Sequence, residues 1–445
     1  MNLLKDDIRR LFYYFLVPAI SSAVAVATYS LIDTIAIGQG VGPDGTAACS
    51  LVLPIFFIAN FIALLCGIGG SVLRNRAGGE GNKEKGNAFF SASIVLVAVL
   101  TLIAWIGGWV FQEPFYRLCG ADDVLLPYAM DYGSWIFATL PSFVLTTFLG
   151  CYIRSDGYPR FVLYATLIGG VINIIGDWLF VFPLNMGMEG AGIATALGSV
   201  VQAGLMAAFL LLKKTSFRLV KPYAWTLAFK KIVVTGFGSG IGALAVIAVS
   251  FIANNQIMKY AGSASLAVYG VLGTVSALFT SIFSGIGQAV QPIAATNFGA
   301  GNLNRNWKVG KLGIKNAVLF STLFAGISIA IPVEVVSIFM KMTPEVEEVT
   351  PFIMRVFSLS YIPQAFCMFA VYFLQAVQSP KMATIISLLR GILLNGGFLM
   401  IFPLFLGGKG VWWAILSAEV VTMMVAAIYL LKLYKTHCSM IITTE

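Results

Sequence analysis

Long stretches without a charged side chain restrict the fold of this sequence more than any other feature. Nine stretches, each long enough to cross a bilayer as a helix, contain no Asp, Glu, Lys or Arg: 11–32, 45–73, 86–112, 132–153, 190–212, 232–258, 260–304, 316–333 and 356–380. Three more qualify when one charge is allowed in each: 161–188, 382–408 and 410–431. A helix of about 20 apolar residues spans the bilayer core, where helices satisfy their own backbone hydrogen bonds. The sequence therefore predicts an all-α membrane protein with twelve transmembrane helices.

The composition excludes several other classes of protein. Charged residues make up 11% of the 445 residues, against about 25% in soluble proteins. The net charge of +9 does not indicate nucleic acid, because the Lys and Arg residues are scattered between apolar runs. The six cysteines form no CxxC pair and the single histidine is His437, so we expect neither a disulfide framework nor a Cys/His metal site. The run 11–32 lacks a small-residue cleavage signature before Asp33, which favours a retained helix.

Positive residues are distributed unequally between the two sides of the predicted membrane topology. Counting loops alternately from the N-terminus, one side holds 22 Lys and Arg and the other holds four, with Arg355 and Arg390 inside spans. Cytoplasmic loops retain positive residues. We therefore expect a multi-pass protein of the plasma (inner) membrane with both termini in the cytoplasm.

Short motifs recur in the same order and at a nearly constant spacing, which indicates an internal repeat. Three pairs show it: Gly67-Ile68-Gly69 with Gly285-Ile286-Gly287, Pro159-Arg160 with Pro380-Lys381, and Gly190 and Ala194 with Gly410 and Ala414. The spacing, about half of the chain, predicts a six-helix N-terminal lobe over 1–212, a cytoplasmic linker over 213–231 and a second six-helix lobe over 232–445. Six helices per copy make the repeats parallel, an arrangement found in transporters.

Ionisable residues inside predicted spans are candidates for function because they are costly to bury in lipid. Asp33 closes the first span and Asp177 lies within the fifth, one helical turn after Asn173. Carboxylate and amide oxygens together can hold a proton or a small hard cation. The structural alternatives are an interfacial helix end for Asp33 and a hydrogen-bonded pair between helices for Asn173 and Asp177.

The last two spans carry opposite charges, Arg390 and Glu419. Opposite charges on adjacent helices most often neutralise each other, so we expect a structural or gating role for this pair, or a contact with substrate. Pro18 interrupts the first span well before Asp33, and a proline there leaves a carbonyl unpaired and bends the helix.

These motifs together make the chain resemble the multidrug and toxic compound extrusion (MATE) family over nearly its whole length. They are Asp33-Thr34 after Pro18, Arg154-Ser155-Asp156-Gly157 with Pro159, Asn173-x3-Asp177, and Gly190-Ala191-Gly192-Ile193-Ala194-Thr195. The acid in the twelfth helix and the arginine in the eleventh look like the drug-exporting bacterial branch. The resemblance implies two pseudo-symmetric six-helix lobes in a V-shaped fold and export of organic cations in exchange for H+ or Na+.

The resemblance also implies a cation-coupling site in the N-terminal lobe. Matched motif by motif, it falls on Asp33, Tyr132, Asn173, Asp177 and Thr195, with Na+ possible at Asp33, Asn173 and Asp177. A helix bend near Pro18 would respond to protonation. The chain differs from members that carry acids in the seventh helix, because 232–258 contains none.

We therefore expect an antiporter, not an enzyme, that is coupled to H+ or Na+ and exports cationic amphipathic drugs or toxic organic compounds. Its partners would be organic cations and membrane lipid, with no nucleic acid and no cofactor besides the coupling ion, and it would act as a monomer. The alternative is a flippase or exporter of lipid-linked precursors with a related two-lobe fold. That function favours several basic residues in a cleft, and only Arg355 and Arg390 lie within spans.

Overall fold

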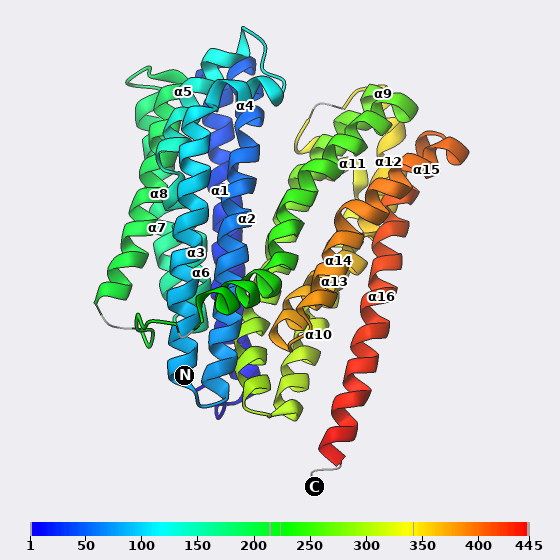
Figure 1. Cartoon of the computed structure of the whole chain (residues 1–445). Coiled ribbons are helices and arrows are strands. Elements are labelled where there is room, and N and C mark those ends of the chain that lie inside the picture. The colour runs from blue at the N-terminus through cyan, green and yellow to red at the C-terminus, as the bar shows by residue number, and fades with distance from the viewer. Residues whose placement is uncertain (1, 213–214, 223, 341, 443–445) are drawn as a thin grey trace. The chain divides into compact units, whose positions relative to one another are not determined.

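The computed structural model describes residues 2–212, 215–222, 224–340 and 342–442, and within these ranges every regular element is a helix (Figure 1). In chain order they are α1 (Ile8–Gly40), α2 (Pro43–Gly79), α3 (Lys83–Val110), α4 (Gln112–Leu118), α5 (Leu125–Ala138), α6 (Leu140–Ser155), α7 (Pro159–Val181), α8 (Gly187–Leu211), α9 (Trp225–Gly299), α10 (Leu303–Ala330), α11 (Pro332–Ser337), α12 (Pro344–Leu359), α13 (Tyr361–Ala376), α14 (Pro380–Leu388), the π-helical turn η1 (Leu389–Leu393), α15 (Leu394–Leu406) and α16 (Gly408–Ile442). The predicted all-α fold is confirmed.

The helices account for the twelve predicted spans. Ten helical segments of the described chain are long and apolar enough to cross a membrane, and the pair α5 and α6, bent by 51°, makes an eleventh. α9 supplies two spans, because its 75 residues would extend about 110 Å as one helix. It is broken at Gly262, whose φ of 80° is readily adopted only by glycine.

The chain divides into two compact units. Residues 17–240 form one, called here the N-terminal unit, and the residues up to 16 together with those from 241 form the other, the C-terminal unit. The start of α1 thus belongs with the second repeat, where Arg305 Nη2 donates to the backbone oxygen of Asp6 at 2.7 Å and Asn297 Nδ2 to that of Leu3 at 3.1 Å. The start of α9 belongs with the first repeat, since a Cβ on Gly236 would lie 1.9 Å from the backbone oxygen of Leu65.

Equivalent turns in the two repeats use the same residues for the same backbone reason. Pro159 and Pro380 begin α7 and α14, where a missing N–H costs nothing and the fixed φ suits the first turn. Gly81 and Gly301 follow α2 and α9 with φ values of 79° and 73°. The repeated motifs therefore mark helix boundaries.

The predicted linker, 213–231, is only partly a loop. Its residues 213, 214 and 223 lie outside the described residues, and α9 already begins at Trp225. The segment 215–222 is non-helical and packs on the N-terminal unit through the contacts described below.

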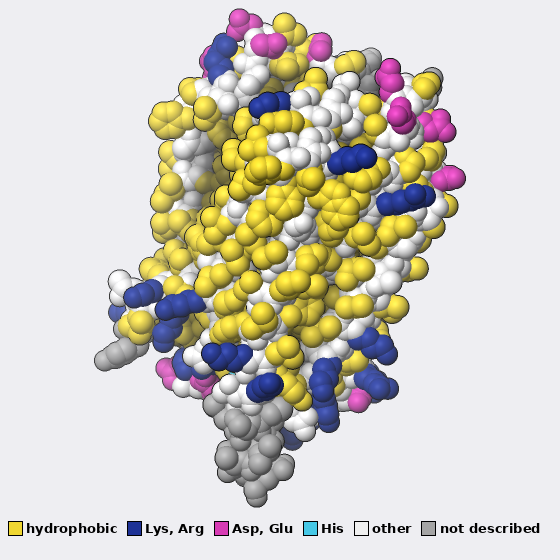
Figure 2. Space-filling view, turned by 90° about the vertical axis from the view of Figure 1, so that its right-hand side faces the viewer, with side chains coloured by type: hydrophobic (Ala, Val, Ile, Leu, Met, Phe, Trp, Pro, Cys, Tyr) yellow, Lys and Arg dark blue, Asp and Glu magenta, His cyan; other side chains and the backbone are white. Residues whose placement is uncertain are grey.

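The surface of the molecule exposes many large apolar side chains, which suits contact with lipid. Figure 2 shows a broad hydrophobic face with Asp and Glu gathered mainly at one end and most Lys and Arg at the other. Large apolar side chains stand exposed, for example Phe405 at 81% and Ile428 at 68%. Such surfaces are not tolerated on soluble monomers, so the chain is a multi-pass membrane protein.

Candidate functional site

Small residues bring α7 and α8 into direct backbone contact. A Cβ on Gly169 would lie 2.8 Å from the Gly198 oxygen, and one on Gly198 would lie 2.7 Å from the Gly169 oxygen. Further along the same faces, a Cβ on Gly176 would lie 2.8 Å from that of Ala194. This small-residue packing, common between membrane helices, sets the polar residues of the two helices against each other.

Five residues from four helices meet beside this contact. Tyr132 on α5 donates its hydroxyl to Asp33 Oδ2 at 3.2 Å. Thr195 on α8 donates to Asp33 Oδ1 at 3.3 Å and accepts from Asn173 Nδ2 on α7 at 3.2 Å. Asp177, one turn after Asn173, lies directly beside the carboxyl group of Asp33. All five residues of the predicted coupling site are therefore brought together within the N-terminal unit.

Asp177 is the unusual member of this cluster. Its side chain is 1% exposed, and neither carboxylate oxygen has a hydrogen-bond partner among the described residues. The Oδ1 atom of Asn173 likewise has none. A buried carboxylate without a partner costs several kcal/mol. A proton on one carboxyl group, or a cation between the two, would remove that cost.

The donor set fits a small hard ion. Two carboxylates, the amide oxygen of Asn173 and the hydroxyl oxygens of Tyr132 and Thr195 are all oxygen ligands, which hard cations prefer. The structure therefore offers Na+ the three residues predicted for it, Asp33, Asn173 and Asp177. The same two carboxyl groups can instead share a single proton. Binding of H+ or Na+ by this cluster stays a prediction.

The opposite charges of the last two spans form an ion pair inside the C-terminal unit. Arg390 Nε on η1 donates to both carboxylate oxygens of Glu419 on α16, at 2.9 and 3.1 Å. The Glu419 side chain is 6% exposed and that of Arg390 is 23% exposed. Arg390 and Glu419 are thus paired, as expected for opposite charges on adjacent helices. A gating or substrate role for the pair stays a prediction.

Pro18 lies inside α1, which continues as one helix from Ile8 to Gly40. Ser22 Oγ donates to the Pro18 oxygen at 2.7 Å. The chain passes from the C-terminal to the N-terminal unit between Leu16 and Val17, immediately before this proline. A bend that responds to the coupling ion stays a prediction.

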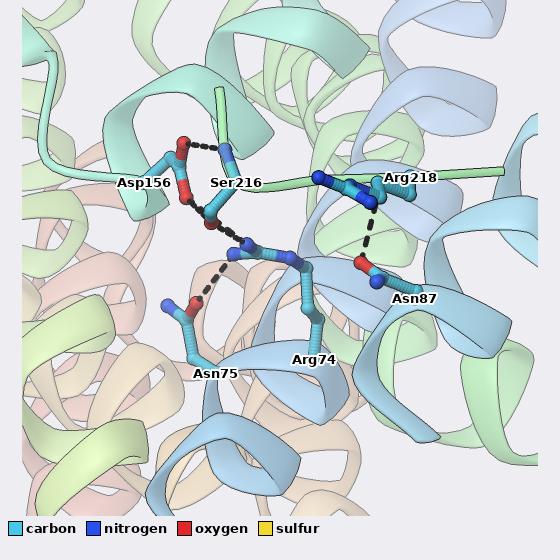
Figure 3. Close-up of polar contacts among 6 residues, drawn as sticks. All are labelled: Arg74, Asn75, Asn87, Asp156, Ser216 and Arg218. Atoms are coloured by element: carbon cyan, nitrogen blue, oxygen red, sulfur yellow. Dashed lines mark hydrogen bonds and ion pairs between the residues drawn. The ribbon is translucent and has the colours of Figure 1, made fainter. Parts of the chain in front are cut away.

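One polar cluster was not anticipated from the sequence, although its motif was noticed. Asp156, in Arg154-Ser155-Asp156-Gly157, accepts from Arg74 Nη2 at 3.0 Å, from the backbone nitrogen of Ser216 at 2.7 Å and from the Ser216 hydroxyl (Figure 3). Arg74 also donates to the Ser216 hydroxyl. The motif therefore anchors the linker to the ends of α2 and α6. The only signal for this contact in the sequence was the position of Asp156 in a predicted loop with basic residues.

Aromatic and backbone contacts complete this anchor. The Phe217 ring lies 4.8 Å from that of Phe90 and beneath the Arg74 guanidinium, at 4.4 Å. The backbone nitrogen of Arg218 donates to Asn87 Oδ1 at 3.2 Å (Figure 3). The linker is thus fixed along α2, α3 and α6 of the N-terminal unit.

Comparison with known protein families gives a clear match. A family model described as MatE matches residues 18–179 and, a second time, residues 239–400. The offset between the two matches equals that between Pro159 and Pro380, which confirms the predicted duplication.

Several curated proteins are similar to the chain. YoeA of Bacillus subtilis, a probable multidrug resistance protein, is 26% identical over 70% of this chain and 69% of its own length. An FAD transporter of Shewanella oneidensis is 25% identical over 88% of both chains. The multidrug export protein MepA of Staphylococcus saprophyticus is 25% identical over 96% of this chain and 95% of its own length.

Solved structures share the fold. An outward-facing multidrug resistance MATE family transporter of the MOP superfamily superposes with a TM-score of 0.91 at 21% identity, covering 98% of each chain. A MOP superfamily transporter from Pyrococcus furiosus gives 0.89 at 22% identity, covering 96% of each. The chain therefore has the same arrangement of helices as these two structures.

Proposed function

The chain belongs to the MatE family of multidrug efflux transporters, and we propose that it exports organic cations across the plasma membrane in exchange for entering H+ or Na+. The observation that carries this proposal is the buried, unpartnered carboxylate of Asp177 beside Asp33. Two adjacent acids with no basic partner among the described residues favour the binding of an external cation. Binding and release of that cation can therefore drive a cycle.

The hydrogen bonds of the cluster support a coupling mechanism. Asp33 is held by Tyr132 and Thr195, and Thr195 is linked to Asn173. When a monovalent ion binds between the carboxyl groups, it occupies the site and cancels one of their two negative charges. The attraction for an organic cation is then weaker, so ion and substrate favour different states of the site. An antiporter requires this exclusion, because a state that holds both or neither would dissipate the gradient.

The distribution of surface charge supports an orientation with both termini in the cytoplasm. In the predicted topology, 22 Lys and Arg fall on one side and four on the other, and the face in Figure 2 has mainly acidic residues at one end and mainly basic residues at the other. Cytoplasmic loops retain positive residues. We propose that the protein acts as a monomer in this orientation and needs no cofactor besides the coupling ion.

A second candidate is an anionic cargo that carries phosphate, such as a flavin nucleotide or a lipid-linked precursor. Two observations favour it: the Shewanella relative is named an FAD transporter, and Arg390 places a guanidinium inside a span. The coupling ion would bind at the same two carboxyl groups of the N-terminal unit, but an anionic cargo would not compete with it for their charge.

Dye efflux from proteoliposomes tests the proposal. We would reconstitute the full chain, load a fluorescent cationic dye, and impose a proton gradient and, separately, a sodium gradient. We expect one gradient to drive efflux in the wild type and Asp177→Asn to reduce that efflux to the level of protein-free vesicles. Asp44→Asn is the matched control, because Asp44 is exposed in the first turn of α2.

Two results would contradict the proposal. Full gradient-driven efflux by Asp177→Asn would remove this carboxylate from coupling. The absence of gradient-dependent movement of any cationic dye in the wild type would shift the cargo to the anionic class.

A further inference from the structure

The ion pair in the C-terminal unit leaves most of its arginine unused. Arg390 makes both of its contacts with Glu419 through Nε. Its two terminal nitrogens, Nη1 and Nη2, have no partner among the described residues, and the side chain is 23% exposed while Glu419 is 6% exposed. Glu419 is therefore the more deeply buried partner, and its hydrogen bonds with Arg390 do not use the fork of two terminal nitrogens.

An unused guanidinium fork is expensive inside a membrane span. A guanidinium has five N–H donors, and one is satisfied here, which leaves four. Lipid chains offer no acceptors, so such donors must meet water or an anionic group. Glu419 cancels the charge of Arg390 without satisfying the fork, so the pair can remain buried and still bind a second acceptor.

The backbone around Arg390 is built to hold this fork in place. Arg390 lies in η1, the π-helical turn between α14 and α15. Such turns are rare in proteins, and those that occur are often found at functional sites. Asn395 Nδ2 donates to the Arg390 backbone oxygen at 2.6 Å. The next residue, Gly391, approaches α9 so closely that a Cβ would lie 2.5 Å from that of Ala245. The turn is thus fixed from two sides.

We propose that the Nη fork of Arg390 binds a carboxylate or phosphate group, with Glu419 holding the guanidinium in position. A planar fork matches the two oxygens of such a group and binds them in a bidentate way. The group could belong to a transported solute or to a phospholipid headgroup. This inference rests on the proposed transport function and adds acidic molecules to its substrates, alongside cations drawn to the N-terminal unit.

A pair of fluorescent probes that differ by one phosphate tests this site directly. Riboflavin 5′-phosphate and riboflavin would be titrated by fluorescence anisotropy against the full chain in phosphatidylcholine nanodiscs. We expect the phosphate to tighten binding at least tenfold in the wild type. Arg390→Lys should abolish this preference, because lysine keeps the charge opposite Glu419 and loses the planar fork.

Matched variants separate this site from the rest of the protein. Arg355→Lys, an exposed arginine on α12 of the same unit, should keep the preference for phosphate. Asp177→Asn should also keep it while losing gradient-driven transport, so that failure of the coupling proposal and failure of this one are distinguishable. Binding of a cationic dye should be unchanged in Arg390→Lys, which shows that the variant is folded.

The lipid composition of the nanodisc identifies the source of the anion. If phosphatidylglycerol in the disc removes the phosphate preference of the wild type, a lipid headgroup occupies the fork; if the preference persists, the fork selects a solute. Equal binding of the two probes to the wild type in phosphatidylcholine would overturn the proposal. A preference that survives Arg390→Lys would overturn it as well.

Discussion

The two repeats place very different side chains at equivalent points between their last two helices. At the offset that relates the two MatE matches, Arg390 is the counterpart of Gly169. At the offset that relates Gly190 to Gly410, Glu419 is the counterpart of Ser199, which follows Gly198. Where the first repeat presses two backbones together, the second inserts an ion pair. Duplication has kept the path of the helices, while side chains have changed their spacing and chemistry.

The two polar clusters also differ in their charge balance. In the first repeat, Asp33 and Asp177 adjoin each other with hydroxyl and amide groups around them and no basic partner among the described residues. In the second, Arg390 and Glu419 neutralise each other. An external cation is therefore needed only by the first cluster, which explains why we assign coupling to the N-terminal unit alone.

The largest expected effect comes from breaking the self-neutralised pair. Arg390→Met should lower the stability by about 3 to 5 kcal/mol, because it leaves the buried Glu419 without its basic partner. The double variant Arg390→Met/Glu419→Leu should recover most of this loss. Thermal unfolding of the purified chain in detergent measures both.

The first repeat supplies the contrast for that experiment. Asp177→Asn removes a charge that has no basic partner, so its unfolding midpoint should stay equal to or rise above that of the wild type. A large loss of stability in Asp177→Asn, or none in Arg390→Met, would show that the two clusters do not differ as described.

A smaller effect is expected where the first repeat depends on glycine. Gly198→Ala should cost about 1 to 3 kcal/mol, because the new Cβ would meet the Gly169 oxygen at 2.7 Å and the Asn173 Cβ at 3.0 Å. Gly204→Ala on the same helix is the control, since a Cβ there meets nothing within 4 Å; it should be neutral or stabilising by up to about 1 kcal/mol. Comparison of the two unfolding midpoints decides whether close packing or helix propensity matters. Equal behaviour of the two variants would argue against a required backbone contact.

The smallest expected effect distinguishes H+ from Na+ as the coupling ion. Thr195→Val removes a donor to Asp33 and an oxygen ligand, a change worth about 1 kcal/mol or roughly fivefold in affinity. A Na+ site would bind more weakly without the ligand, whereas a proton site would bind more tightly, because the ionised carboxylate loses a hydrogen bond. Half-maximal activation of transport by each ion measures this, with Thr195→Ser, which retains the hydroxyl, as the control. No change with either ion would place Thr195 outside the coupling site.

Much of the fold could be predicted because lipid imposes a simple rule on the sequence. Charge-free stretches such as 11–32 and 316–333 can only be spanning helices. The boundary between the two spans of α9 was harder to predict from the sequence. Lys259 separates 232–258 from 260–304 in the sequence, but the helix actually breaks at Gly262, since backbone conformation, not charge, decides where a helix ends.

The candidate site was predictable as a set of residues and not as an arrangement. Asn173 and Asp177 could be placed on one face from their spacing alone, while Tyr132 was matched only through the family motif. Its hydrogen bond to Asp33 joins residues 99 positions apart, and no local pattern encodes such a distance. The linker anchor at Asp156 was missed for the same reason, because Ser216 lies 60 residues further along the chain.

The sequence by itself determined that this protein spans a membrane, repeats its fold and buries two acids in its first half, because hydropathy, repetition and charge are properties of the chain. Only the tertiary structure decided that Asp177 lacks a partner, that Arg390 keeps a free fork, and that the first residues of α1 belong with the second repeat. These are matters of which side chains from distant helices come within about 3 Å of one another, and packing alone settles that.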